Sequence, residues 1–124
     1  MLSEKFYEVL KNEGIVTIVT WSNEEPHIVN EWNSYLVVTE DERILIPAGL
    51  MHKTEANINE NRRILMALGS KNVLGFNNYQ GTGFVIKGFA RFFSSGKEYE
   101  MMKSKFSFLT RVLEITVTSA EQML

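Results

Sequence analysis

Six segments of the chain are rich in β-branched and aromatic residues, and short polar turns join most of them. Such side chains fit the pleated, half-buried surface of a β-strand. Helical patterns stand between some of these segments, but they do not alternate with them regularly, which disfavours a doubly wound parallel sheet. The sequence therefore predicts a small antiparallel β-barrel. The expected strands are residues 15–22, 27–39, 44–47, 63–70, 83–93 and 111–119.

Two or three short helices are expected beside these strands. Ser3 can cap a first helix that Gly14 ends, because a hydroxyl satisfies free N–H groups and glycine stops a helix readily. Thr54 is expected to cap a second helix from Glu55 to Asn61, and residues 97–109 form a third, amphipathic pattern.

Composition excludes several classes of protein. The 124 residues predict one domain over 1–124, and the absence of cysteine excludes disulfides, zinc ribbons and iron–sulfur clusters. The formal net charge of −2 argues against a nucleic-acid-binding surface. Neither an 18-residue apolar run nor a signal-peptide pattern is present, so we expect a soluble, cytoplasmic protein without membrane contact. The only histidines, His27 and His52, lack metal-ligand spacing, and no metal site is predicted.

The stretch GLMHKTEANI (residues 49–58) places Lys53 and Thr54 at the expected start of a helix. A helix N-terminus favours an anion, so a cation there can share a phosphate with the free N–H groups. The alternative is an ordinary capped helix with a solvated lysine. These residues alone leave both interpretations open.

The stretch PHIVNEWNSYL is unusually polar for a strand of a barrel. Asn and Ser are depleted from strands unless they form specific hydrogen bonds. Amides beside a tryptophan can hold a flat heterocycle, since the amides bond ring nitrogens and carbonyls while the indole stacks. The alternative is a solvent-facing strand with one buried tryptophan, and both remain open on this stretch alone.

The stretches LKNEG, PHIVNEWNSY, PAGLMHKTEANI, GTGF and ITVTSAEQML occur in an order typical of one group of proteins. From end to end the chain resembles the pyridoxamine-phosphate oxidase-like split β-barrel flavoproteins, and among them the small FMN-binding proteins of sulfate-reducing bacteria. The resemblance implies a mainly β fold, a six-stranded antiparallel split β-barrel. It also implies a homodimer with one non-covalent FMN per subunit near the dimer interface.

Residues that match the family by position are expected to contact FMN at its phosphate, at its ring and from the partner subunit. The expected set is Lys53 and Thr54, with Asn30 and Ser34, at the phosphate; Glu31, Trp32, Asn33 and Tyr35 beside the ring; Pro47, Ala48 and Gly49 in backbone that passes the ring; and Leu124 of the partner subunit over it. Small side chains in the 47–49 segment would permit close approach of the ring.

Electron transfer by the bound FMN, with an unidentified redox partner protein, is the implied function. The alternative is an NAD(P)H-dependent flavin reductase or a small-substrate oxidoreductase of the same fold, and a third is a module for another phosphate-bearing ligand. The residues include no dedicated acid–base pair, so no catalytic residue is predicted, and whether the chain is an enzyme stays open.

Two positions depart from the family pattern. Glu31 stands where the family carries a small hydroxyl residue, and Phe108 stands where it carries a tryptophan near the flavin. A carboxylate beside the ring disfavours the anionic reduced flavin. We therefore expect the flavin potential to be lower than in a Glu31→Thr variant. Phe108 removes one possible electron donor to the excited flavin, although Trp32 remains.

Overall fold

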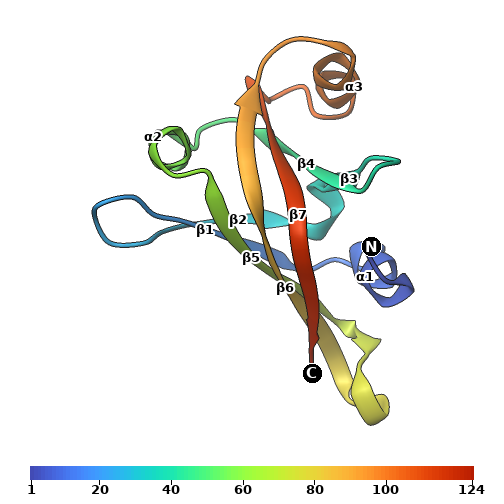
Figure 1. Ribbon diagram of the computed structural model, residues 1–124. Coiled ribbons are helices and arrows are strands. Elements are labelled where there is room, and N and C mark those ends of the chain that lie inside the picture. Colours follow the sequence, from blue (N-terminus) through green and yellow to red (C-terminus); the bar gives the residue numbers. More distant parts are fainter.

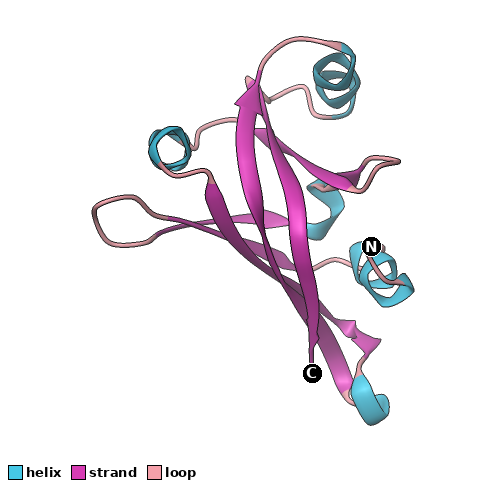
Figure 2. Ribbon diagram, viewed as in Figure 1, coloured by secondary structure: helices cyan, strands magenta, loops and turns pink.

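The computed structural model describes residues 1–124 and contains one antiparallel sheet of seven strands with three α-helices around it (Figures 1 and 2). In sheet order the strands are β2 (His27–Trp32), β1 (Ile15–Thr20), β5 (Arg63–Leu74), β6 (Gln80–Phe93), β7 (Arg111–Met123), β4 (Arg43–Ala48) and β3 (Val37–Val38). The helices are α1 (Glu4–Leu10), α2 (His52–Glu60) and α3 (Lys97–Lys105), with 3-10 turns at Asn33–Tyr35 and Phe76–Asn78. The mainly β, antiparallel fold is confirmed.

The connection between β2 and β3 forces the sheet to curl. These strands lie at the two opposite edges of the sheet, yet only residues 33–36 separate them along the chain. In a flat sheet, six inter-strand spacings of about 4.8 Å would hold the edges about 29 Å apart. The five residue steps from Trp32 to Val37 reach about 18 Å at most. The sheet therefore bends toward itself and forms a half-barrel.

The prediction of six strands was wrong because the expected strand 27–39 is interrupted. It ends at Trp32, continues as a 3-10 turn, and resumes as the two-residue strand β3, which pairs with β4. The sheet consequently has seven strands, and β2 and β3 belong to different edges.

The side chain of Asn33 explains the interruption. Asn33 is buried, and its Nδ2 donates to the carbonyl oxygens of Val9, Asn12 and Gly69 at 3.3, 2.8 and 3.0 Å. Its backbone N–H donates to the carbonyl of Gly14 at 2.9 Å. A Cβ on Gly14 would lie 1.9 Å from the Gly69 carbonyl oxygen, so glycine is required for this close approach. These bonds replace the ladder that a continuous strand would form.

The hydrophobic core lies on the inner face of the curled sheet, and α1 closes it. Burial alternates along β1 and along the first half of β5, as expected for strands with one face inward. Under α3, a smaller cluster fills the other face of β4 and β7. The main core includes Phe6, Val9, Val16, Ile18, Ile44, Ile46, Met66, Phe84, Ile86, Leu113 and Ile115, and the smaller cluster is Leu45, Met102, Leu109 and Val112.

The first helix agrees with the sequence at its start but not at its end. The Ser3 hydroxyl accepts a hydrogen bond from the Phe6 N–H at 3.1 Å, which confirms the predicted cap. The helix ends at Leu10, with Lys11 as its C-cap, so Gly14 serves the close contact described above rather than helix termination.

The second helix begins earlier than predicted. It starts at His52, because Met51 takes a left-handed conformation (φ 70°) as the N-cap residue. Thr54 therefore lies inside the helix, and the prediction that it caps the helix was wrong. No side chain caps this N-terminus. The third helix ends at Lys105, before the predicted residue 109.

Ion pairs attach α3 to the sheet. Arg43 on β4 pairs with Glu98 on α3 and with Glu114 on β7, each at 2.6 Å. The other Glu114 oxygen pairs with Arg91 on β6 at 2.7 Å. The Glu114 carboxylate is almost fully buried, and these partners compensate the cost of removing its charge from water.

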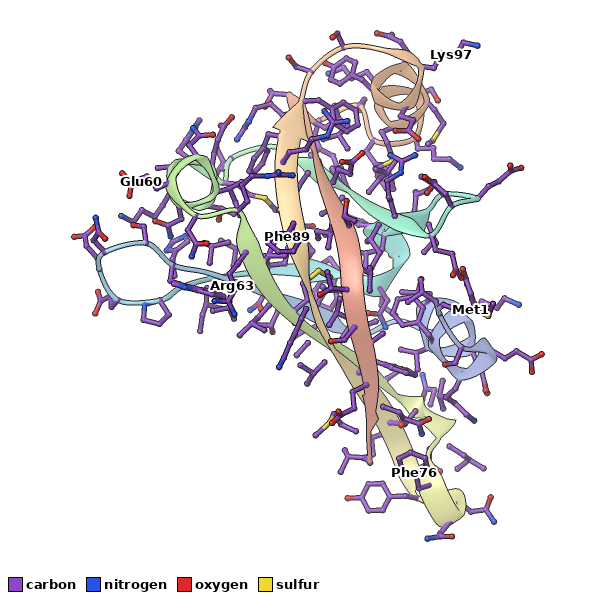
Figure 3. The ribbon with its side chains drawn as sticks, viewed as in Figure 1. Met1, Glu60, Arg63, Phe76, Phe89 and Lys97 are labelled. Atoms are coloured by element: carbon purple, nitrogen blue, oxygen red, sulfur yellow. The ribbon has the colours of Figure 1, made fainter.

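The long β5–β6 hairpin and the C-terminus lie at one end of the molecule, and α3 lies at the other (Figures 1 and 3). Phe76 projects from the hairpin tip, while the chain enters α3 at Lys97. None of the three helices has the length and apolar composition needed to cross a membrane.

We predict that Asn33→Ala destabilises the protein by about 2 kcal/mol, since the side-chain NH₂ has two N–H donors to share among the three carbonyls and each hydrogen bond contributes about 1 kcal/mol. Urea unfolding followed by circular dichroism measures this change. Asn23→Ala, in the exposed β1–β2 loop, is the matched control and should change stability by less than about 0.5 kcal/mol. Equal losses in the two variants would contradict the role assigned to Asn33.

Candidate functional site

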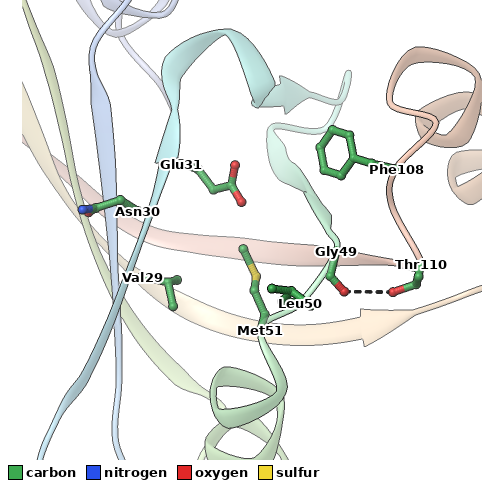
Figure 4. A pocket seen from close by; sticks show the side chains of 8 residues that line it. All are labelled: Val29, Asn30, Glu31, Gly49, Leu50, Met51, Phe108 and Thr110. Atoms are coloured by element: carbon green, nitrogen blue, oxygen red, sulfur yellow. Dashed lines mark hydrogen bonds between the residues drawn. The ribbon is translucent and has the colours of Figure 1, made fainter.

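The largest cavity lies where the half-barrel stays open, between edge strand β2 and the segment that links β4 to α2 (Figure 4). Its volume is about 580 Å³. Pockets for small ligands and cofactors usually measure about 300–1,000 Å³ and have mostly apolar walls. The lining residues are Val29, Asn30, Glu31, Gly49, Leu50, Met51, Phe108 and Thr110.

Strand register determines which β2 side chains point into the cavity. Glu31 is opposite Val16, and Val29 is opposite Ile18, so both share the inner face with these buried β1 residues. Asn30 points the other way (Figure 4), where its Oδ1 accepts a hydrogen bond from the Thr17 hydroxyl at 2.9 Å. Asn30 can therefore reach a ligand in the cavity only through its backbone.

Arg111 holds the opposite wall in place. Its guanidinium donates to the carbonyl oxygens of Gly49 and Leu50 at 3.2 and 2.7 Å. The Thr110 hydroxyl adds a bond to the Gly49 carbonyl at 3.1 Å (Figure 4), and Glu55 pairs with the Arg111 Nε at 2.8 Å. The wall is thus fixed from β7 and from α2.

Glu31 is the only titratable side chain that lines the cavity. It is half-buried, and loss of water contact raises its pKa to about 7. No hydrogen bond and no neighbouring charge contributes to this shift. The cavity therefore holds an unpaired carboxyl group that changes charge near neutral pH.

Aromatic rings form the outer rim. Phe108 lines the cavity and is half exposed. Behind it stand Tyr35 and Phe106, with ring centroids 5.8 and 6.2 Å from that of Phe108. The Tyr35 and Phe106 rings are 5.4 Å apart. The predicted site residue Tyr35 thus supports the rim without lining the cavity.

The N-terminus of α2 begins at the cavity, since its N-cap residue Met51 lines the wall. Its first N–H groups have no side-chain cap. One turn further on, the Thr54 hydroxyl is buried and has no hydrogen-bond partner. Free N–H groups beside an unpaired buried hydroxyl are the donors that an anion at a helix start requires.

Lys53 turns away from the cavity. Its Nζ pairs with the Glu24 carboxylate in the β1–β2 loop at 2.8 Å, and this bond raises the pKa of the lysine and lowers that of Glu24. Beside it is a second, polar hollow of about 290 Å³. That hollow is lined by Ser22, Asn23, Glu24, Lys53, Ala56, Asn57 and Glu60.

Several other expected residues lie outside the cavity. Ser34 donates its hydroxyl to Glu13 at 2.7 Å, and this bond lowers the pKa of that carboxyl. The Asn33 amide is occupied by its bonds to backbone carbonyls, including that of Asn12. Trp32 is 46% exposed on the outer face of the sheet. Leu124 lies at the far end, where its carbonyl accepts from the Phe76 N–H at 3.1 Å.

Of the 47–49 segment, only Gly49 lines the cavity, because Pro47 and Ala48 are buried in β4. Sequence reasoning missed four lining residues: Val29, Leu50, Met51 and Thr110. Strand alternation could have indicated Val29, which shares its face with Glu31. Leu50 and Met51 lie between the predicted Gly49 and Lys53, so continuity of the segment was the available signal.

Known proteins resemble the chain over its whole length. The family model for pyridoxamine 5'-phosphate oxidase matches residues 2–124. An "FMN-binding protein" of Nitratidesulfovibrio vulgaris (strain DSM 19637 / Miyazaki F) is 52% identical over 124 residues, which cover 100% of both chains.

Solved structures share the fold at low sequence identity. HupZ from Group A Streptococcus superposes with a TM-score of 0.78 and 18% identity, covering 97% of this chain and 92% of that one. An FMN-binding protein from Syntrophomonas wolfei superposes with a TM-score of 0.73 at 16% identity. The match covers 98% of this chain and 85% of that one. Because the family model spans nearly every residue and the curated relative aligns from end to end, the chain belongs to the pyridoxamine 5'-phosphate oxidase family.

Proposed function

We propose that the chain binds one FMN, with the isoalloxazine ring in the cavity and the phosphate at the start of α2, and that it serves in electron transfer. The observation that carries the proposal is the uncapped α2 N-terminus, with its unpaired Thr54 hydroxyl, beside a cavity of cofactor size. The relative that is 52% identical is named an FMN-binding protein, which supports the same ligand.

The residues present fit a flavin. Val29, Leu50 and Met51 offer apolar contact to a ring, and Phe108 adds an aromatic edge at the opening. Gly49 leaves its backbone accessible, since it has no side chain to cover the wall. Backbone groups on the free side of edge strand β2 can bond the polar edge of a heterocycle.

The phosphate would be held by the N–H groups of the first α2 turn and by the Thr54 hydroxyl. Lys53, the residue before Thr54, would add a positive charge. It must first give up its ion pair with Glu24 to reach the phosphate. This exchange costs little, because solvent screens an exposed ion pair.

Bound FMN would supply the storage and transfer of electrons. The chain would bind and orient it, and the rim at Phe108 would leave one side open to a redox partner. Apart from Glu31 the lining contains neither a titratable side chain nor a nucleophile beyond the Thr110 hydroxyl, which is bonded to Gly49. The cavity therefore favours an electron carrier over an enzyme with its own acid–base groups.

A homodimer would cover the outer face of the sheet. Ile15, Ile28 and Trp32 are exposed on β1 and β2, and Phe89 and Met123 are exposed on β6 and β7. Exposed apolar patches of this kind mark interaction surfaces. We infer that a second copy packs there and that the partner subunit's Leu124 covers the flavin ring.

We predict that the purified protein binds one FMN per chain and that Lys53→Met weakens FMN about tenfold, as expected for a lost charge-assisted bond at an exposed site. Riboflavin, which lacks the phosphate, should bind both proteins equally. Fluorescence quenching titrations measure these affinities, and Lys97→Met on α3 is the control. A protein that binds neither flavin would overturn the proposed function, while NADH turnover with added flavin would favour the reductase alternative.

Glu24→Gln should strengthen FMN binding about threefold, because it releases Lys53 from an exposed, solvent-screened ion pair. Glu25→Gln removes the same charge from the adjacent position without breaking that pair, and it serves as the matched control. Riboflavin affinity should not change in either variant. An equal gain in the two variants would show that general charge, rather than competition for Lys53, sets the affinity.

Leu124→Ser should weaken FMN several-fold and raise the fluorescence of the bound flavin, because the proposed cover from the partner subunit becomes polar. The substitution keeps the backbone carbonyl that accepts from Phe76. Light scattering reports whether the protein is still a dimer. A dimer with unchanged FMN affinity and fluorescence would remove Leu124 from the site, and a monomer that binds FMN tightly would remove the dimer from the proposal.

A further inference from the structure

Glu31 is placed in the cavity without any structural partner. Its neighbours in the lining are apolar or offer only backbone and hydroxyl groups, and none is charged. Figure 4 shows its carboxylate directed into the space between Met51 and Phe108. Buried carboxylates in folded proteins are normally paired or hydrogen-bonded, because an unpaired one costs free energy. Neither the fold nor the ion-pair network uses this group.

Apart from Glu31, no charged side chain lines the cavity, and Arg111 of β7 contacts the lining only at the backbone carbonyls of Gly49 and Leu50. On α2, Lys53 is paired with Glu24, and Glu55 is paired with Arg111 of β7. Strand β1 has no titratable residue, and the 106–110 segment has none. The remaining titratable or charged groups on these elements are His27 on β2, Tyr35 in the 3-10 turn, Arg43 on β4, and His52 and Glu60 on α2.

We propose that Glu31 takes up a proton when the flavin beside it is reduced, so that the protein couples electron uptake to proton uptake. This inference rests on the proposed function. Two electrons come from an external donor, a reduced partner protein or a chemical reductant. One proton from solvent would form an N–H bond on the reduced flavin, and a second would form the O–H bond on the Glu31 carboxylate. The two electrons and two protons leave the net charge of the site unchanged.

Repulsion between like charges explains why Glu31 would take up a proton on reduction of the flavin. Above neutral pH, reduced flavin is an anion, and a carboxylate in the same poorly hydrated cavity would repel it strongly. Because burial already raises the Glu31 pKa to about 7, a small further rise is enough to protonate it at neutral pH. Below pH 7 the group is already protonated and takes up nothing on reduction. The coupling therefore operates above the pKa that Glu31 has beside oxidised FMN, which is at or above its value of about 7 in the free protein.

Binding of oxidised FMN should show the same linkage. The ring covers Glu31 and removes more water, which raises its pKa further and favours the protonated form. FMN affinity of the wild type should therefore fall as pH rises through about 7. A rise of one unit in the pKa would make this loss about tenfold.

The first experiment measures FMN affinity from pH 6 to pH 9 by fluorescence quenching, without any redox chemistry. We expect the affinity of the wild type to fall by up to about tenfold, and that of Glu31→Gln to stay flat. Glu60→Gln, an exposed change on α2, should behave like the wild type. A flat profile in the wild type, or the same profile in Glu31→Gln, would overturn the inference.

The second experiment measures the midpoint potential of the bound flavin against pH. Above the pH at which Glu31 ionises beside oxidised FMN, the wild type should take up two protons per two electrons, and Glu31→Gln should take up one. Glu31→Thr, a second variant, should also take up one, and thermal melts confirm that both variants fold. Equal proton counts in all three proteins would overturn the coupling even if FMN is bound. Failure of every protein to bind FMN would instead overturn the proposed function.

Discussion

The hydrogen bonds of the buried Asn33 amide determine where the half-barrel stays open. One NH₂ group joins the carbonyls of Val9 in α1 and Asn12 just after it to that of Gly69 on β5. This fixes the turn that carries the chain from one edge of the sheet to the other in four residues. These bonds stabilise the turn at the end of β2, and through that turn the two edges face each other across the cavity. The site is thus a consequence of a broken strand.

Local pattern predicted the elements that depend on local forces. The Ser3 cap, the inward face of β1 and the antiparallel pairing all follow from residues close together in sequence. Asn33 could not be predicted in the same way, because its partners lie 21 to 36 residues away and only the fold brings them near. The prediction that Thr54 caps α2 was also wrong. Met51 takes a left-handed conformation and begins the helix three residues early, and methionine rarely adopts that conformation.

The site residues, too, were predicted only where the fold was not needed to place them. The resemblance to the flavoprotein family placed site residues on both walls, Glu31 on one side and Gly49 on the other. Which side chains point into the cavity was harder to predict. Alternation separates Trp32 from Glu31, but it does not say which face becomes the cavity; that depends on how the sheet curls. Lys53 was expected at the phosphate, yet it bonds Glu24, a partner that no local spacing indicates.

Two charged groups at opposite ends of the proposed site are held in states that a ligand could change. Lys53 has a replaceable partner, and Glu31 has none. Burial raises the pKa of Glu31 from 4.5 in the unfolded chain to about 7, so this group lowers the stability of the fold as pH rises from about 4.5 to about 7. A hydroxyl residue there would carry no such cost. Structural packing alone gives no reason to keep a destabilising, unpaired carboxylate in a cavity wall, whereas the proposed uptake of a proton from solvent when a bound redox group is reduced does.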